Sequence, residues 1–213
     1  MTFATGFEHV LQPDVPLAPH TWMRLGGPAQ FLAEPTSVEE LESLVARARE
    51  ENLPTRLLGG GSNLLVKEEG VAGVVIRLTA PAFGHIRIEG NRVIAGSGAK
   101  LAHVVSSAAR EGLSGLEQLV GIPGTVGGAL HGNAGTHGDD IGQFTRRANV
   151  LTRGGQAIAR ETDDLHFAHH QSSLDELAIL DAEFELEPED PQVIARRMQT
   201  LWIVKRSSEP SGT

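Results

Sequence analysis

The stretch Gly121-Ile-Pro-Gly-Thr-Val-Gly-Gly-Ala129 is the most informative part of the sequence. Pro123 fixes one backbone angle, whereas the glycines on either side can adopt angles that other residues avoid. The glycine-rich run continues to Gly138, and seven of these eighteen residues are glycine. Because glycine loses more conformational entropy on folding than other residues, this density favours a flat, extended ligand pressed against the backbone.

A second glycine cluster lies within Leu58-Gly-Gly-Gly-Ser-Asn-Leu-Leu65. It follows a predicted strand over 55–58, so several backbone N–H groups can turn toward one anion, with Ser62 and Asn63 as additional donors. The ligand expected at such a loop is a phosphate or pyrophosphate. The spacing matches neither the Rossmann nor the Walker pattern, and a plain tight turn is the alternative interpretation.

The composition excludes several classes of function. The 213 residues include 18 basic and 27 acidic side chains, which gives a formal net charge of −9. An acidic chain without a basic block predicts no nucleic-acid partner. The absence of cysteine excludes disulfides, thiolate metal sites and cysteine nucleophiles. Without a run of 18 apolar residues or a signal-peptide pattern, we expect no membrane partner.

Hydrophobic periodicity predicts three helices. Ser37-Val-Glu-Glu40 is a capping box that begins a helix ending near Glu51. A second helix over 101–109 is stopped by Gly112. Asp190-Pro191 begins the last helix, because proline is favoured at the first helical position.

The strands predicted between these helices complete an α+β fold of two subdomains. They lie at 73–78, in hairpins at 85–95 and 148–160, and at 180–186, where apolar and acidic residues alternate. The expected division is one subdomain over 1–78, a second over 79–189, and a C-terminal segment over 190–213.

Four blocks of the sequence resemble, in order, motifs of the UDP-N-acetylenolpyruvoylglucosamine reductase (UDP-N-acetylmuramate dehydrogenase) family. They are His20–Ala29, Leu58–Leu65, Gly112–Glu117 with its continuation Gly121–Ala129, and Asn133–Gly138. The resemblance implies a two-subdomain FAD-binding fold of the vanillyl-alcohol-oxidase (PCMH) type. It also implies a cytoplasmic flavoenzyme of peptidoglycan precursor synthesis. In the family reaction NADPH reduces the flavin, which then reduces UDP-N-acetylglucosamine enolpyruvate to UDP-N-acetylmuramate.

The same resemblance implies where the cofactor binds. The Gly59–Asn63 loop would hold the FAD pyrophosphate, and the 121–138 segment would run along the pyrophosphate and the isoalloxazine ring. Related proteins attach flavin covalently through a His or Cys; the first loop has no His and the chain has no Cys, so non-covalent FAD is expected. The predicted cofactor-binding residues are Gly59, Gly60, Gly61, Ser62, Asn63, Leu64, Gly121, Ile122, Pro123, Gly124, Thr125, Gly127, Gly128, Ala129, Asn133, Gly135, Thr136 and Ile179.

The segment Phe167-Ala-His-His-Gln-Ser172 departs from the family. The family carries Phe-Gly-Tyr-Arg-x-Ser there, with the Arg stabilising the enolic intermediate. His170 therefore stands at the position of the catalytic Arg, and Ser172 at a substrate-binding position. Because histidine is neither permanently cationic nor bidentate, we expect weaker stabilisation of developing negative charge, by on the order of 3–4 kcal/mol.

The family also continues into a third domain that brings a proton-donating Ser or Cys and a late Glu, whereas this sequence ends at Thr213. We therefore expect a truncated chain, an isolated FAD-binding part or a degenerate copy, with FAD binding retained more readily than turnover. Two other functions stay open. One is a non-catalytic FAD-binding module, and the other is a flavoprotein oxidase of the same superfamily that acts on another substrate.

Several remaining features have simpler interpretations. Trp202 is expected to be a packing residue, and the apolar stripe of the last helix to be partly exposed and to promote self-association. The acidic face over 181–187 is expected to be solvated, and Thr21 and Arg24 to be structural. No metal site is predicted, because no carboxylate–His helix spacing accompanies His131, His137, His166, His169 and His170.

Overall fold

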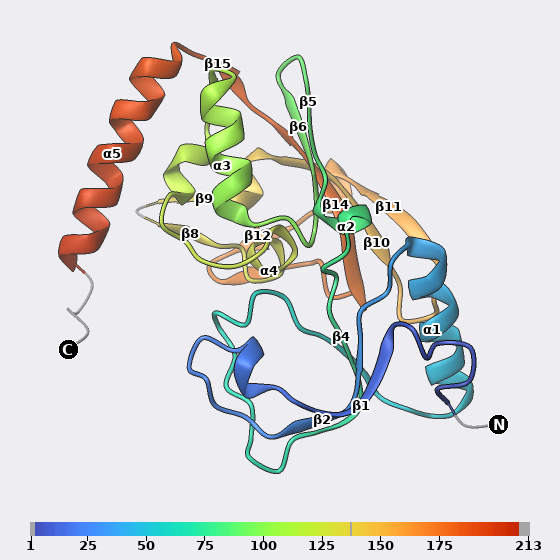
Figure 1. Ribbon diagram of the computed structural model, residues 1–213. Helices are drawn as coiled ribbons and strands as arrows, with labels where there is room; N and C mark the ends of the chain where they lie inside the picture. The colour runs from blue at the N-terminus through green and yellow to red at the C-terminus, as the bar shows by residue number, and fades with distance from the viewer. Residues whose placement is uncertain (1–2, 137, 209–213) are drawn as a thin grey trace.

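The computed structural model describes residues 3–136 and 138–208, whose longer strands form two sheets (Figure 1). The first sheet contains, in spatial order, β1 (Leu11–Pro16), β2 (Pro28–Ala33), β4 (Val71–Ile76) and β3 (Thr55–Leu57). β2, β4 and β3 are parallel, and β1 is antiparallel to β2. The 13-residue helix α1 (Val38–Glu50) connects β2 to β3, as a parallel crossover requires.

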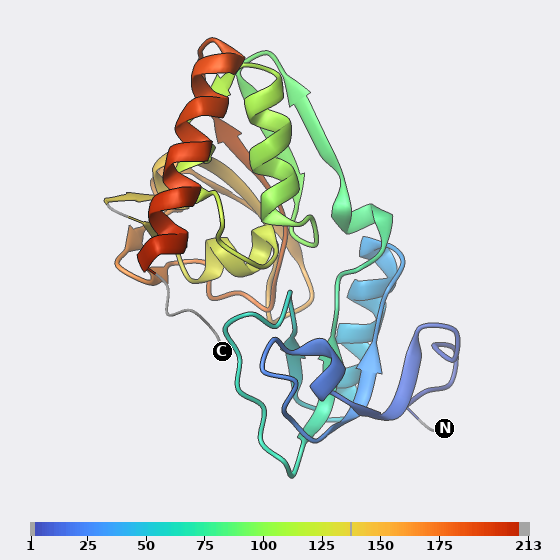
Figure 2. The same cartoon turned by 60° about the vertical axis from the view of Figure 1, so that its left-hand side comes forward.

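The second sheet is antiparallel and contains, in order, β11 (Ala157–Glu161), β10 (Thr145–Leu151), β14 (Ala178–Glu185), β6 (Arg92–Gly96) and β5 (Ile86–Glu89). Helices α3 (Leu101–Arg110) and α4 (Val126–His131) cover one face, and α5 (Pro191–Ser208) lies beside α3 (Figures 1 and 2). The other helical turns are η1 (Ala18–His20), α2 (Pro81–Gly84), η2 (Leu116–Leu119), η3 (Ile141–Phe144) and η4 (Thr162–Asp164). Three short ribbons pair β12 (Phe167–Ala168) with β13 (Gln171–Ser172), β15 (Glu187–Pro188) with β7 (Leu113–Ser114), and β8 (Gly135–Thr136) with β9 (Asp139–Asp140).

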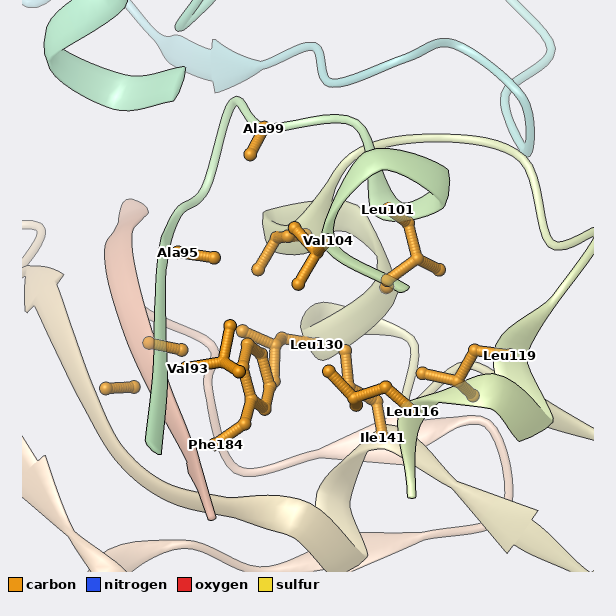
Figure 3. Close-up of a cluster of buried hydrophobic side chains, with 14 of the residues drawn as sticks. Val93, Ala95, Ala99, Leu101, Val104, Leu116, Leu119, Leu130, Ile141 and Phe184 are labelled. Atoms are coloured by element: carbon orange, nitrogen blue, oxygen red, sulfur yellow. The ribbon is translucent and has the colours of Figure 1, made fainter. Parts of the chain in front are cut away.

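The larger hydrophobic core lies between the second sheet and its helices (Figure 3). Val93 of β6 and Phe184 of β14 are paired across neighbouring strands and are fully buried. They face Leu116 of η2 and Leu130 of α4, which are also fully buried. Alternation along the second half of β14 puts Ala182 and Phe184 on this face and Glu183 and Glu185 on the other.

A second core joins the two sheets. Leu44 of α1 and Ile76 of β4 belong to the same buried cluster as Leu151 of β10 and Leu180 of β14. The first sheet and α1 therefore pack against the end of β10 and the beginning of β14 through shared apolar side chains. The division into 1–78, 79–189 and 190–213 stays a prediction, and residues 1–2 and 209–213 lie outside the described residues.

The predicted helices are confirmed. Of the two hydrogen bonds in the predicted capping box at α1, only the one accepted by Ser37 forms. The Ser37 hydroxyl accepts a hydrogen bond from the Glu40 N–H at 3.2 Å. The Glu40 carboxylate instead accepts from the N–H and hydroxyl of Thr36, at 2.6 and 2.8 Å. The carboxylate therefore stabilises the chain just before the cap.

The predicted strands are confirmed with shifted boundaries. β4 begins at Val71 rather than Gly73, which has φ +86° and lies where the register between β2 and β4 shifts. The predicted acidic face of β14 is the accessible side of the sheet, with the Glu185 side chain 43% exposed, and the sequence did not show that neighbouring strands supply partners to its carboxylates. These pairs are Glu183 with Arg92, Glu185 with Arg146, and Asp181 with Asn149.

The last helix is exposed as expected along part of its surface. Ile203 and Val204 are 57% and 47% exposed. The prediction that Trp202 is a packing residue is wrong. Its side chain is 46% exposed, and the Arg206 guanidinium lies 5.0 Å from its ring centroid. No helix within 3–136 and 138–208 is long and apolar enough to cross a bilayer.

Candidate functional site

The two glycine-rich segments meet at the junction between the two sheets. A Cβ added to Gly60 would lie 2.9 Å from the Cα of Gly124. The Ser62 hydroxyl also donates to the Pro123 carbonyl at 3.3 Å, across 61 residues of sequence. The structure thus brings together two segments that the sequence analysis selected separately.

The Gly59–Asn63 loop presents consecutive backbone donors. Within the described part of the chain, none of its five N–H groups donates to a protein acceptor, although Gly61 is buried. The Gly61 carbonyl is occupied, because it accepts from the Trp22 N–H at 3.0 Å. Converging N–H groups without protein partners are suited to bind an anion, and buried donors rarely stay unsatisfied.

The fold itself requires several glycines of the second segment, which gives part of the glycine density a structural reason that the sequence did not show. Gly121 and Gly124 have φ of +79° and +118°, a region that favours glycine. A Cβ on Gly127 would lie 2.9 Å from the Cβ of Ser97. Gly128 differs, because the residue is exposed and a Cβ added to it would lie 3.6 Å from its nearest neighbour, the Thr125 hydroxyl. Gly128 therefore leaves room for a ligand to approach the backbone.

The second segment is held by the turn Gly96-Ser97-Gly98, which the sequence analysis did not single out. Gly127 N–H donates to the Ser97 carbonyl at 2.9 Å, and Val126 N–H donates to the Ala99 carbonyl at 3.0 Å. The Ser97 side chain is buried, and its hydroxyl has no hydrogen-bond partner among the described residues. An unsatisfied buried hydroxyl beside this segment is a group that a ligand could satisfy. In the sequence, the tripeptide of small residues is the one feature that could have indicated this turn.

Three predicted cofactor residues also have roles inside the protein. Asn133 is 3% exposed; its amide accepts from the Gly142 N–H at 3.1 Å and donates to the Ala168 carbonyl at 2.9 Å. The Thr136 hydroxyl donates to the Gln118 carbonyl at 3.1 Å. Ile179 is 8% exposed and belongs to the core between sheet and helices. Their contacts with a cofactor stay predictions.

The predicted catalytic residue lies at the tip of the β12–β13 ribbon. His169 and His170 form its turn, with ring centroids 4.0 Å apart, and His170 has φ +56°. The Ser172 hydroxyl donates to the His131 carbonyl of α4 at 3.0 Å. This bond and the Asn133–Ala168 bond fasten the ribbon to the second glycine segment. His170 is therefore exposed on a ribbon adjoining that segment.

Charge contributes little at the first loop. Burial lowers the pKa of His20 from its ordinary value of 6.5, and the nearby Arg77 lowers it further. The His20 imidazole is therefore neutral at pH 7, and it is the backbone carbonyl of His20 that lies against the Gly61 position. His20 therefore supplies no positive charge to an anion bound at this loop.

Other sites for a ligand are less suitable. A cavity of about 120 Å³ lies between η2, β8 and α5, lined by Gln118, Thr136 and Leu201 among others. It is smaller than the ~300–1,000 Å³ typical of cofactor pockets. No group of three metal-ligating side chains occurs among residues 3–136 and 138–208; His137 lies outside them.

Comparison with known proteins first defines the class. Residues 29–159 match the model of the FAD binding domain. The fold also aligns with 6-hydroxy-D-nicotine oxidase from Arthrobacter nicotinovorans at a TM-score of 0.59, with 18% identity over 86% of this chain and 40% of that chain. The fold is an FAD-binding domain of the vanillyl-alcohol-oxidase (PCMH) type, as expected from the sequence.

Closer relatives define the family. The UDP-N-acetylenolpyruvoylglucosamine reductase of Rhodopirellula baltica is 44% identical over 209 residues, or 98% of this chain and 68% of that protein. The reductase of Listeria innocua is 36% identical over 96% of this chain and 69% of that protein. The crystal structure of the Thermus caldophilus reductase aligns with a TM-score of 0.82 and 34% identity, over 94% of this chain and 71% of that one. The chain belongs to the UDP-N-acetylenolpyruvoylglucosamine reductase family.

Proposed function

We propose that the chain binds FAD non-covalently at the junction between its two sheets. The observation that carries this proposal is the row of five N–H groups from Gly59 to Asn63, which have no acceptor among residues 3–136 and 138–208 and lie against Gly124. These groups would hold the pyrophosphate. Other parts of the same molecule would contact the backbone at Gly128, where the space beside the residue is free, and the Ser97 hydroxyl, which has no partner among the described residues.

The proposed reaction follows from the family. We infer that FAD, when bound, supplies hydride chemistry for the NADPH-linked reduction of UDP-N-acetylglucosamine enolpyruvate to UDP-N-acetylmuramate in the cytoplasm. The names of the relatives support the sugar-nucleotide substrate. This chain's own contribution would be to bind the cofactor and to expose it beside the β12–β13 ribbon.

The test of cofactor binding is the visible absorption spectrum of the purified chain after addition of FAD and desalting. We expect a retained flavin spectrum with 1:1 stoichiometry, released by denaturation because no covalent bond forms. A colourless protein would contradict the proposal. A retained flavin makes NADPH oxidation in the presence of the enolpyruvyl sugar nucleotide the next assay.

His170 is proposed to stabilise negative charge that develops on the substrate. Replacing it with a permanent cation, in His170→Arg, should raise turnover by up to about 10²-fold, the contribution of one well-placed donor. The control is His169→Arg, which puts the same charge on the neighbouring residue of the same turn. Steady-state NADPH oxidation measures both, and equal rates in the two variants would argue against a specific role of His170.

A non-catalytic FAD-binding module is the second candidate function, and the histidine at position 170 is the observation that favours it. A chain of this kind would retain FAD yet show no NADPH oxidation that depends on the sugar nucleotide. The alternative of an oxidase with another substrate gains no support, because the likeness to the nicotine oxidase shows the fold alone.

A further inference from the structure

Asn133 ends helix α4 in a backbone conformation that usually belongs to glycine. Its N–H donates to the Leu130 carbonyl at 3.1 Å, and the Ala134 N–H donates to the Ala129 carbonyl at 2.7 Å. These are the two bonds of a Schellman motif, in which the residue after the C-cap has a positive φ and is most often glycine. Asn133 has φ +40°. An asparagine at this position indicates that its side chain has a use of its own.

The side chain of Asn133 joins three segments of the chain. It is 3% exposed; its Oδ1 accepts from the Gly142 N–H of η3 at 3.1 Å, and its Nδ2 donates to the Ala168 carbonyl of β12 at 2.9 Å. One partner is a donor and the other is an acceptor, so the orientation of the amide is fixed. Both ends of this buried amide therefore have partners inside the protein.

A second contact holds the β12–β13 ribbon at the same junction. A Cβ added to Gly142 would overlap the Cγ of Phe167, so the Phe167 ring lies directly against the Gly142 backbone. Phe167 also packs against the larger core. Asn133 thus bonds to the residue beneath the Phe167 ring and to the residue that follows Phe167 in the ribbon.

The two histidines of the ribbon follow this junction directly. Ala168 precedes His169 and His170, which form the turn between β12 and β13. Two residue pairs form the ribbon, and an isolated hairpin of this size is not stable in water. Its position beside the second glycine segment therefore depends on contacts with neighbouring segments. Of the two side-chain bonds that fasten it, the Asn133 bond is partly buried and the Ser172 bond is exposed.

We propose that Asn133 is a positioning residue: through Ala168, its amide fixes the β12–β13 ribbon, and with it His170, beside the second glycine segment. This inference rests on the proposed function, since it presupposes that FAD binds along this segment and that His170 acts on the substrate. It goes beyond the predicted role of Asn133 as a cofactor contact, because it assigns the side chain to the ribbon.

The test uses two substitutions of Asn133 and one matched control. Asn133→Gly removes the amide and suits the positive φ, so the end of α4 keeps its backbone conformation. Asn133→Asp keeps the oxygen that accepts from Gly142 and loses the donor to Ala168. The control is Thr145→Val, because Thr145 is also 3% exposed and its hydroxyl donates to the Ile141 carbonyl of η3 at 2.8 Å. It removes a buried bond to the same turn, outside the ribbon.

Amide hydrogen exchange measured by NMR reports on the ribbon, and titration calorimetry reports on FAD binding. We expect exchange of the 167–172 amides to become about tenfold faster in both Asn133 variants, as for one lost hydrogen bond, and to stay unchanged in Thr145→Val. FAD affinity should stay within about threefold of that of the unaltered chain, whereas loss of a direct contact should weaken it about tenfold. The NMR signals of the His170 ring should shift on addition of FAD in the unaltered chain and in the control, and less in Asn133→Gly.

The other outcomes would overturn the inference in distinguishable ways. Unchanged ribbon exchange in the Asn133 variants would show that other contacts hold the ribbon. Equal acceleration in Thr145→Val would assign the effect to a general loss of stability. Weaker FAD binding with an unchanged ribbon would assign Asn133 to the cofactor. Failure of the unaltered chain to bind FAD would overturn the proposed function, while ribbon exchange without FAD would still decide whether Asn133 fixes the ribbon.

Discussion

Glu117 is 1% exposed, yet its carboxylate has several partners. It accepts from the Ser114 hydroxyl at 2.9 Å, from the Gly115 N–H, and from the guanidinium of Arg197. Arg197 also donates to Glu189 at 2.9 Å, and the carboxylates of Glu189 and Glu117 together raise the pKa of Arg197. Because Arg197 lies on α5 and Glu117 on η2, this cluster fastens the last helix to the turn that precedes the second glycine segment.

Glu117→Ala should lower the free energy of unfolding by about 3 kcal/mol, because it leaves a partly buried guanidinium without its buried partner and leaves buried donors unsatisfied. Urea unfolding followed by circular dichroism measures the change. The control is Glu189→Ala, which removes the other carboxylate from the same guanidinium. A larger loss in the control would show that the exposed partner, rather than the buried one, holds α5.

Gly60→Ala tests whether close approach of the glycine segments is required. The added methyl would meet the backbone of Gly124, which cannot move aside as a side chain could. We expect the free energy of unfolding to fall by about 1–3 kcal/mol and FAD affinity to fall with it. Gly84→Ala is the matched control, because no atom lies within 4 Å of its added methyl. Equal stability of the two variants would contradict the observed packing.

At the scale of single elements, the stability of α1 depends on contacts with the residues just before it. The backbone N–H of Thr36 lowers the pKa of Glu40, the hydroxyl of Thr36 contributes, and His9 adds a further contact at 2.5 Å. A carboxyl whose pKa is lower in the folded than in the unfolded state stabilises the fold above the unfolded value of about 4.5. This stabilisation is lost as the pH falls through the folded value.

Glu40→Gln should therefore reduce stability at pH 7 by about 1 kcal/mol, a figure that allows for solvent screening. The difference from the unaltered protein should shrink as the pH falls below about 4.5, where the carboxyl becomes protonated. Thermal unfolding at a series of pH values measures it. Glu42→Gln, on the same helix, removes one charge without touching the Thr36 contact. A difference that persists at low pH would assign the effect to packing.

At the scale of the whole molecule, the two sheets share a core and also share the proposed cofactor site. Leu151 and Leu180 of the second sheet pack with Leu44 and Ile76 of the first, while Gly60 and Gly124 meet on either side of the junction. A ligand that contacts both glycine segments binds only when the two sheets are correctly packed. Its binding energy should therefore stabilise the entire fold.

FAD at about 100 times its dissociation constant should raise the melting temperature by about 5–10 °C, because such saturation contributes about 2.7 kcal/mol. Differential scanning calorimetry should show a single transition with and without FAD, as expected for sheets that unfold together. Gly60→Ala should reduce the shift. Two transitions, with only one responding to FAD, would mean that the cofactor contacts a single sheet.

Local patterns were sufficient to predict the helices α1, α3 and α5 and the strands of the second sheet, whereas β1, β2 and α4 were not predicted. The 3.6-residue period of α1 and the two-residue period of β14 follow from side chains within one segment, and both predictions are confirmed. The two glycine segments were also found from composition alone, because glycine among apolar neighbours is unusual in a flexible linker. The resemblance to a reductase family added the FAD-binding fold, which the comparisons confirm.

Contacts between distant residues could not be predicted in this way. The partners of Glu183 and Glu185 come from neighbouring strands, so an apparently solvated face is paired. The burial of Glu117 depends on Arg197, 80 residues later. The bonds Trp22–Gly61 and Gly27–Lys67 likewise join two loops that lie side by side only after folding.

The sequence by itself determined the three longest helices, the strands of the second sheet, the two glycine segments and the family, because each of these is encoded in neighbouring residues. Only the tertiary structure decided which glycines serve packing and which leave room for a ligand, since that depends on what lies opposite each backbone. The same holds for the exposed apolar side chains of Trp22 and Leu65. Hydrophobicity along the chain predicts burial, whereas exposure is decided by which surfaces remain uncovered once the two sheets have packed.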